Sequence, residues 1–163
     1  MTADYISYLV ERYSDTIVRI CYTYLKNKSD AEDVCQDVFL KIIDKSPEFD
    51  DKKHEKAYLI KTAVNMCKNK LTSFWNKNKC SEDNIPESGA YDNYKDDTVI
   101  NAVLSLPEKY RIAVYMFYYE GYSTLEISKI IGKSDATVRS YLHRAREKLK
   151  TVLKEEYDFE QKI

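Results

Sequence analysis

Helix-breaking residues are scarce in this sequence, which has only 3 glycines and 3 prolines among 163 residues. Glycine and proline mark turns and the ends of regular elements, so few such interruptions are expected. The rest of the chain is rich in Lys, Glu, Leu and Ile. The composition therefore predicts an almost wholly helical, all-α protein, with room for one ordinary domain or two small helical ones.

Cysteine is also sparse, and its spacing argues against two kinds of site. The four cysteines lie far apart, and no two form a C-x-x-C pair: Cys21, Cys35, Cys67 and Cys80. A zinc site or a disulfide framework is therefore not expected. We interpret the cysteines as small apolar side chains or free thiols in a reducing cytoplasm, and leave open whether Cys80 is redox-active.

Residues that could form a catalytic centre are missing as well. The two histidines, His54 and His143, lie far apart, and neither has a credible nucleophile or metal partner. We therefore expect no enzymatic activity, no metal and no cofactor. The sequence shows no signal peptide, transit peptide or long apolar run, so we expect a soluble, cytoplasmic protein without membrane insertion.

The net charge of −1 conceals two basic segments. Residues 52–79 contain eight lysines and one acid, and residues 129–150 contain seven Lys or Arg and two acids, giving net charges of +7 and +5. The stretches outside them are acidic. Two basic patches predict two contacts with one polyanion, and acidic surfaces that serve another purpose.

The second basic segment lies in the clearest motif of the chain, two helices joined by a tight turn. Ser123 and Glu126 have the spacing of a capping box, and Gly132 can end that short helix in the left-handed conformation. Its predicted buried face is Leu125, Ile127, Ile130 and Ile131. Ser134 can cap a second helix, with Asp135 at the positive end of its dipole. This order is the helix-turn-helix pattern.

The second, basic helix separates apolar from polar residues. Spacings of three and four unite one apolar stripe: Val138, Leu142, Ala145, Leu149 and Val152. The opposite face carries side chains that can reach phosphates and base edges: Arg139, Ser140, His143, Arg144 and Arg146. Such a helix is expected to enter the major groove of DNA.

Three longer helices are predicted before this motif. Their apolar residues recur at helical spacing over residues 4–27, 31–45 and 55–76. Ser29 or Asp30 is the expected cap of the second helix, and Pro47 is expected to end it in a loop. The exposed side of that helix is acidic in its first turns. The helix dipole alone explains this charge, whereas Phe39 and Leu40 beside it favour a protein-binding surface; both interpretations stay open.

The third helix has a lysine-rich exposed side with polar and aromatic residues between the lysines. These residues are Lys56, Tyr58, Lys61, Asn65, Lys68, Asn69, Phe74 and Trp75. Lysines that follow a backbone and aromatic rings that stack on bases suit single-stranded nucleic acid. A solvated lysine face, with Trp75 closing the core, is the competing interpretation.

The stretch from Cys80 to Asp97 has no periodicity, contains Pro86 and Gly89, and is acidic. It is interpreted as a flexible linker, which predicts an N-terminal domain over 1–78, a linker over 79–97 and a C-terminal domain over 98–163. In the last of these, a short helix is expected over 99–106. A second, over 108–119, would have its core positions at Ile112, Tyr115, Met116 and Tyr119.

The order of the motifs is similar to that of a known family. The sequence runs Asp-Ala-Glu-Asp-Val-Cys-Gln-Asp-Val-Phe over 30–39 and Ala-Tyr-Leu-Ile-Lys-Thr-Ala-Val-Asn over 57–65. After the acidic linker, Leu-Ser-Leu-Pro-Glu-Lys-Tyr over 104–110 precedes the helix-turn-helix. From about Tyr13 to Leu153, this set resembles a small bacterial RNA polymerase sigma factor of the extracytoplasmic-function group, group IV.

The resemblance implies a function and a set of partners. In that family the first domain holds the minus-ten element, and the second reads the minus-thirty-five element. Both bind core RNA polymerase, through its beta-prime coiled coil and its beta flap. The resemblance thus implies a sigma factor that directs core RNA polymerase to specific promoter DNA and assists promoter melting. It also implies an anti-sigma factor as a partner that inhibits the protein.

The resemblance also implies roles for individual residues. Four match the helix that docks on the beta-prime coiled coil: Asp33, Gln36, Asp37 and Phe39. Four belong to the minus-ten surface: Tyr58, Lys61, Asn65 and Lys68, with Asn65 at the position associated with capture of a flipped base. Six belong to the minus-thirty-five surface: Lys133, Arg139, Ser140, His143, Arg144 and Arg146. Arg139 and Arg144 are expected to read bases, and Lys133 and Arg146 to hold phosphates.

The sequence departs from the family pattern in three places. The loop over 49–55 has no glycine and several charges, Tyr141 replaces a frequent arginine, and Asp135-Ala136 replaces a small-residue pair. Asp135 could repel a phosphate or bond to a cytosine amine. The alternative function is that of a conventional helix-turn-helix regulator, which binds duplex DNA without polymerase. Binding of single-stranded minus-ten DNA by the first basic patch would argue against this alternative.

Overall fold

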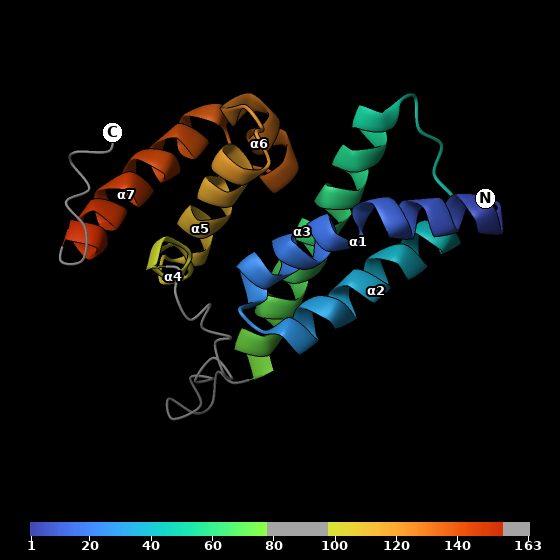
Figure 1. The fold of residues 1–163 in the computed structure, drawn as a ribbon, viewed down its shortest axis with the longest axis horizontal. Coiled ribbons are helices and arrows are strands. Elements are labelled where there is room, and N and C mark those ends of the chain that lie inside the picture. The colour runs from blue at the N-terminus through green and yellow to red at the C-terminus, as the bar shows by residue number, and fades with distance from the viewer. Residues whose placement is uncertain (78–97, 155–163) are drawn as a thin grey trace. The chain divides into compact units, whose positions relative to one another are not determined.

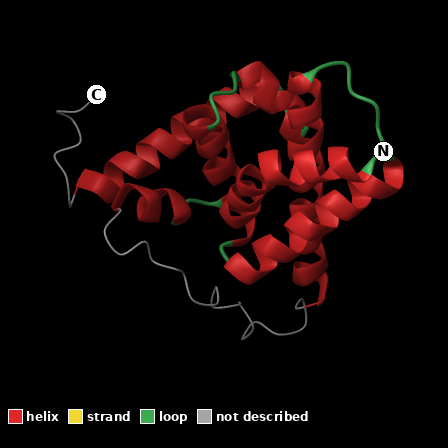
Figure 2. Ribbon diagram, turned by 45° about the vertical axis from the view of Figure 1, so that its right-hand side comes forward, coloured by secondary structure: helices red, strands yellow, loops and turns green. Residues whose placement is uncertain are grey.

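The computed structural model describes residues 1–77 and 98–154, and all regular structure in these ranges is helical (Figure 2). This confirms the predicted all-α class. The chain forms two compact units, unit 1 over 1–91 and unit 2 over 92–163, each described here by itself. The linker predicted over 79–97 lies outside the described residues. No helix within the described ranges is long and apolar enough to cross a lipid bilayer.

Unit 1 is built from three long helices that pack against one another (Figure 1). They are α1 (Ala3–Leu25), α2 (Lys28–Lys45) and α3 (Lys52–Lys77). Each helix turns one apolar stripe inward, as predicted from its spacing. The fully buried side chains include Ile17 and Ile20 of α1, Val38 of α2, and Leu59 and Val64 of α3.

Two helix starts in unit 1 differ from the prediction. α2 begins at Lys28, because the Asn27 side chain accepts a hydrogen bond from the Asp30 N–H at 2.9 Å and so serves as the cap in place of Ser29 or Asp30. α3 begins at Lys52, because the Asp51 carboxylate accepts from the His54 N–H at 2.7 Å. Each acidic or amide cap lies earlier than expected, so each helix gains part of a turn.

Unit 2 contains α4 (Thr98–Leu104), α5 (Glu108–Val114), a π-helical turn η1 (Tyr115–Tyr119), α6 (Thr124–Ile131) and α7 (Asp135–Lys154). α7 packs against α4, α5 and α6. A buried arginine joins α4 to α5: Arg111 donates from Nη1 to the carbonyl of Leu106 at 3.1 Å and to that of Leu104 at 3.4 Å. These bonds satisfy carbonyls at the end of a helix and fix the turn at Pro107.

The π-helical turn changes the predicted register of the helix over 108–119. The Glu120 N–H bonds to the carbonyl of Tyr115 at 3.2 Å, five residues earlier, so the turn holds an extra residue. Ile112, before the π-helical turn, and Met116, its second residue, are buried as expected. Tyr119 is instead 55% exposed, so its predicted core position is wrong, and Tyr115 is half-buried.

Two further core predictions in unit 2 are wrong. Leu125 is 56% exposed. It precedes the buried Ile127 by two residues, which places it about 200° away around the helix, on the opposite side of α6. At the end of α7, Val152 is 44% exposed and Leu153 is buried. The apolar stripe there continues from Leu149 with a spacing of four residues where the prediction used three.

Candidate nucleic-acid interface

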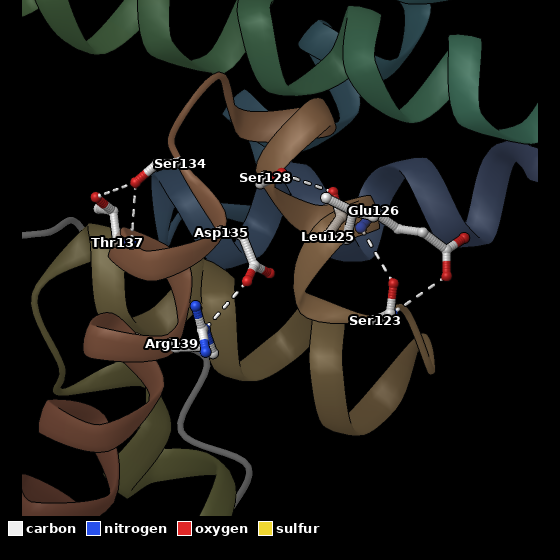
Figure 3. Close-up of polar contacts among 8 residues, drawn as sticks. All are labelled: Ser123, Leu125, Glu126, Ser128, Ser134, Asp135, Thr137 and Arg139. Carbon is white, nitrogen blue, oxygen red and sulfur yellow. Dashed lines mark hydrogen bonds and ion pairs between the residues drawn. The ribbon is translucent and has the colours of Figure 1, made fainter.

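Side-chain caps at the start of α6 and at the start of α7 hold the helix-turn-helix of unit 2 in shape (Figure 3). Ser123 accepts from the Glu126 N–H at 3.1 Å, and the Glu126 carboxylate accepts from the Ser123 N–H at 3.3 Å, which is the predicted capping box. Gly132 then takes the left-handed conformation at φ 71°, with its N–H on the Ser128 carbonyl at 3.0 Å. The turn to α7 therefore follows from residues that the sequence places there.

α7 presents the predicted DNA-contacting residues on its outer side. Val138, Leu142 and Ala145 are buried against the rest of unit 2. The side chains predicted to contact DNA are all exposed: Arg139, Ser140, His143, Arg144 and Arg146 on α7, and Lys133 in the turn before it. The arrangement offers four cations and two further hydrogen-bonding groups to one ligand surface.

Two arginines of α7 are held by tyrosines that sequence reasoning did not connect with the site. Arg146 donates from Nε to the Tyr118 hydroxyl at 2.8 Å, and its guanidinium lies 6.0 Å from the ring centre of Phe117. Arg144 donates to the Tyr110 hydroxyl at 3.5 Å. This bond lowers the pKa of Tyr110 and raises the pKa of Arg144, so the guanidinium stays charged.

A lysine outside α7 adds charge to the same flank. Lys109 of α5 lies 5.2 Å from the ring centre of Tyr110 and 5.7 Å from that of Tyr141, and these two rings meet edge to face at 5.6 Å. Tyr110 lies 34 residues before its partner Arg144 in the sequence, so no local pattern connects the two. Only the richness of 110–122 in tyrosine signalled that this segment holds rings against α7.

α3 of unit 1 carries the second predicted nucleic-acid surface. Tyr58, Lys61, Asn65 and Lys68 recur at spacings of three and four, so they lie along one side of the helix. Lys61 and Asn65 are exposed, whereas Tyr58 and Lys68 are half-buried. Lysines can follow a phosphate backbone there, with an exposed amide available to a base edge.

An aromatic cluster at the start of α3 joins this surface. Phe49, in the loop after α2, meets Tyr58 edge to face at 5.4 Å and His54 at 5.5 Å. The His54 Nδ1 accepts from the Asp50 N–H at 3.2 Å, which fixes the loop on the helix. Phe49 was not among the predicted site residues, because the loop has no periodicity that would reveal its direction.

Glu55 is a buried carboxylate that ties α1 to the start of α3, and the sequence did not indicate it. It is 4% exposed and accepts from the Tyr13 hydroxyl at 2.7 Å, from Tyr8 at 3.3 Å and from Tyr5. Burial by itself would raise the pKa of Glu55, but the bonds from Tyr5 and Tyr13 and the charge of Lys52 together lower it. The carboxylate therefore stays ionised and positions the helix that carries Asn65.

The acidic face of α2 differs in one residue from the prediction. Asp33, Gln36 and Asp37 are exposed at helical spacing. Phe39, predicted with them, is only 7% exposed and belongs to the core of unit 1. Leu40 is 62% exposed and lies one turn after Gln36 and Asp37, so it is the apolar side chain nearest to them on this face; Ile43, one turn later, is 42% exposed.

The described residues offer no metal centre, because no three His, Cys, Asp or Glu side chains among them are grouped closely enough. Cys21, Cys35 and Cys67 are free and buried in unit 1. Burial raises the pKa of Cys35 to about 11, and a hydrogen bond with Cys67 together with burial raises that of Cys21. Thiols of this kind are poor nucleophiles. Cys80, whose redox activity was left open, lies outside the described residues.

Comparison with known proteins finds two matches to family models in the chain. Residues 9–76 match Sigma-70 region 2, and residues 96–149 match Sigma-70, region 4. The first match contains the α2 and α3 surfaces, and the second contains the helix-turn-helix with all six predicted residues of its basic face.

Individual proteins match over most of their length. The ECF RNA polymerase sigma factor SigW of Bacillus subtilis is 26% identical over 90% of this chain and 88% of its own. The RNA polymerase sigma-E factor of Streptomyces coelicolor is 28% identical over 88% and 83%. Among solved structures, the sigma factor RpoE from Bartonella quintana, crystallised with the anti-sigma factor NepR, has the same fold at a TM-score of 0.79 and 22% identity. That match covers 96% of this chain and 100% of RpoE.

Proposed function

Because the chain belongs to the extracytoplasmic-function group of sigma-70 factors, which direct RNA polymerase to promoters, we propose that its two units bind one promoter at two points. Unit 2 binds duplex DNA at the minus-thirty-five element through α7. Unit 1 binds the separated minus-ten strand through α3 and so assists melting. The observation that carries the proposal is the exposed basic face of α7, directly opposite the stripe that anchors it.

At the minus-thirty-five element, we assign base contacts to the first half of α7. In helix-turn-helix proteins the N-terminal part of the second helix meets base edges, and here that part carries Arg139, Ser140 and His143. Arg144 follows on the same face, and its guanidinium can pair bidentately with a guanine. Lys133 and Arg146, at the edges of the face, hold phosphates, and Tyr118 supports Arg146 at 2.8 Å.

At the minus-ten element, Asn65 is the proposed base-capturing residue. Its exposed amide carries a donor and an acceptor, which can pair with the edge of an extruded base. Lys61 and Lys68 lie four residues before and three residues after it on the same side of α3, where they can hold the adjoining phosphates. Tyr58 offers a ring at the start of this row, fixed by its contact with Phe49.

Polymerase docking is assigned to α2. The exposed Asp33, Gln36 and Asp37 lie within two turns before Leu40 on the same side of α2, which gives an apolar centre with an acidic rim toward the helix start. Helix-helix contacts of this kind suit the beta-prime coiled coil of core RNA polymerase, and the beta flap is the proposed second contact. Phe39 contributes from within the core by holding α2 in place. The chain would act in the cytoplasm together with the polymerase.

An anti-sigma factor is a further proposed partner. The solved relative with the same fold was crystallised with one, the anti-sigma factor NepR. A protein that covers the α2 face or the α7 face would prevent polymerase docking or DNA binding. Adding such a protein to a transcription reaction with this chain and core polymerase is expected to abolish the transcript; an undiminished transcript would argue against that partner.

The test of the minus-ten assignment separates duplex binding from melting. In reconstituted holoenzyme, Asn65→Ala is expected to leave binding to a duplex promoter unchanged and to weaken melting by about 5- to 150-fold, measured by permanganate reactivity of thymines. Ser73→Ala removes an exposed polar side chain about two turns further along α3, outside the residues predicted to contact nucleic acid, and serves as the control. Equal losses in binding and melting, or equal effects of the two variants, would contradict base capture by Asn65.

The docking assignment has a separate test. Leu40→Asp and Asp37→Lys are each expected to weaken binding of the chain to core polymerase by at least about tenfold. Leu40→Asp removes the apolar centre, and Asp37→Lys reverses a charge on its acidic rim. Glu11→Lys reverses an exposed charge on α1 and is expected to bind as the unaltered chain does. If all three variants bind core polymerase equally, α2 is not the docking helix.

A further inference from the structure

An ion pair between Asp135 and Arg139 lies at the start of α7 (Figure 3). The Arg139 Nε is 3.1 Å from the Asp135 Oδ2, and the two side chains are 65% and 34% exposed. We propose that Asp135 is a specificity-determining residue for the minus-thirty-five element, which acts by holding Arg139 in position and makes no contact with DNA itself. The inference rests on the proposed function, in which Arg139 reads a base.

The helix start does not require the Asp135 carboxylate. Ser134 accepts from the Thr137 N–H at 3.1 Å and shares a hydrogen bond with the Thr137 hydroxyl at 2.8 Å. Its carbonyl also accepts from the Val138 N–H at 3.0 Å. Ser134 therefore serves as the N-cap of α7, and Asp135, at the next position, is available for a side-chain role.

The direction of the carboxylate argues against direct recognition of a base. Its Oδ1 is shielded from solvent and has no hydrogen-bond partner among the described residues. Its Oδ2 faces Arg139. A cytosine amine would have to share Oδ2 with the guanidinium or turn the carboxylate away from it, and either would weaken the hold on Arg139. The structure thus offers a third role beside phosphate repulsion and a cytosine contact.

The geometry of the guanidinium fits a positioning role. Asp135 engages Nε on the side of the group, which leaves the two terminal nitrogens of Arg139 for another partner. Guanine recognition uses a pair of donors toward O6 and N7. Arg144 and Arg146 are each held by a neutral tyrosine hydroxyl, whereas Arg139 is held by a carboxylate and lies nearest the helix start, where base edges are met.

The charge of Asp135 gives the proposal a distinctive signature. A carboxylate near the DNA backbone lowers affinity for every sequence through repulsion by phosphates. Its removal is therefore expected to raise affinity for DNA in general and to lower discrimination between bases, because Arg139 loses its fixed direction. A residue with a purely structural role would not move these two quantities in opposite directions.

The experiment measures affinity of reconstituted holoenzyme for promoter fragments in which each minus-thirty-five base is varied, using promoters recovered by run-off transcription. Arg139→Ala is expected to lower discrimination at one position by about 5- to 150-fold. Asp135→Ala should lower discrimination at that same position by about two- to fivefold, and Asp135→Asn should lower it by less. When either is combined with Arg139→Ala, the double variant should discriminate no worse than Arg139→Ala alone. Because the ratio of matched to mismatched affinity is compared within one preparation, loss of folded protein does not affect it.

Glu147→Ala is the matched control, because it removes an exposed acid from the same helix three turns later. It should raise general affinity about as much as Asp135→Ala and leave base discrimination unchanged. Full discrimination in Asp135→Ala, or a change at a position that Arg139→Ala leaves alone, would overturn the positioning role. An Arg139→Ala variant that discriminates normally would refute the base contact in the proposed function, and with it this inference.

Discussion

Replacing Glu55 with alanine is expected to destabilise unit 1 by about 3–5 kcal/mol, because it leaves three tyrosine hydroxyl donors without their acceptor, at about 1–3 kcal/mol for each donor that is buried. Glu55 is 4% exposed, and three tyrosine hydroxyls donate to its carboxylate, one of them from Tyr13 at 2.7 Å. Without the carboxylate, the buried Tyr13 hydroxyl loses its acceptor. Glu55→Gln keeps the shape and an acceptor oxygen but loses the charge, so we expect about 1–3 kcal/mol.

The loss can be measured by urea unfolding of the full chain. Hydrogen exchange at the backbone amides of α1, α2 and α3, measured at each urea concentration, follows unit 1 separately from unit 2. Tyr5→Phe removes one of the three donors and is expected to cost about 1 kcal/mol. Glu48→Ala, which removes an exposed acid from the loop before α3, should stay within about 0.5 kcal/mol of the unaltered chain.

The pH dependence supplies a second, independent outcome. The pKa of Glu55 is lowered in the folded chain, so its stabilisation is present above the pKa of the unfolded glutamate, about 4.3, and is lost as the pH falls through the folded value. The difference in unfolding free energy between the unaltered chain and Glu55→Gln should therefore shrink on acidification below about pH 4. A difference below about 0.5 kcal/mol at pH 7, or one that does not shrink, would refute the assigned role.

Three other predictions concern unit 2. Arg144→Ala is expected to cost about 1–3 kcal/mol at a single promoter position when holoenzyme binding to single-base variants is measured; a uniform loss would contradict a base contact. Arg146→Ala should weaken binding equally on all sequences and reduce the salt-dependence slope by about 1, with a smaller loss in Tyr118→Phe; sequence-dependent losses would argue against a phosphate contact. Gly132→Ala should destabilise unit 2 by about 1–2 kcal/mol, measured by urea unfolding followed by circular dichroism, because an alanine at the left-handed φ of 71° is strained. A Cβ at this position would meet no atom within 4 Å, so no steric clash adds to that cost. An unchanged unfolding midpoint would contradict this prediction.

Features set by neighbouring residues were predictable from the sequence. The Ser123–Glu126 capping box, the left-handed Gly132 and the Ser134 cap depend on contacts within four residues, and all three are confirmed. The exposed face of α7 follows from the same helical spacing. Where spacing was ambiguous, as between Phe39 and Leu40, the sequence did not reveal which of two adjacent apolar residues faces the core.

Features that depend on distant residues or on irregular backbone were not predictable. The Glu55 cluster joins residues 42 to 50 positions apart, and no local pattern marks it. The π-helical turn changes the helical period, which moved Tyr119 out of its predicted core position. The Tyr118 support of Arg146 follows from the same turn, so the residues that position the DNA-contacting arginines emerged only with the packed structure.

The central claim, promoter selection through two contacts, is tested most directly by run-off transcription of fragmented genomic DNA with purified core RNA polymerase, with and without this chain. The account predicts transcripts that require the chain and whose start sites share two upstream elements at a constant separation, because α3 and α7 each bind one of them. The absence of chain-dependent transcripts, or start sites that share only one element, would contradict it.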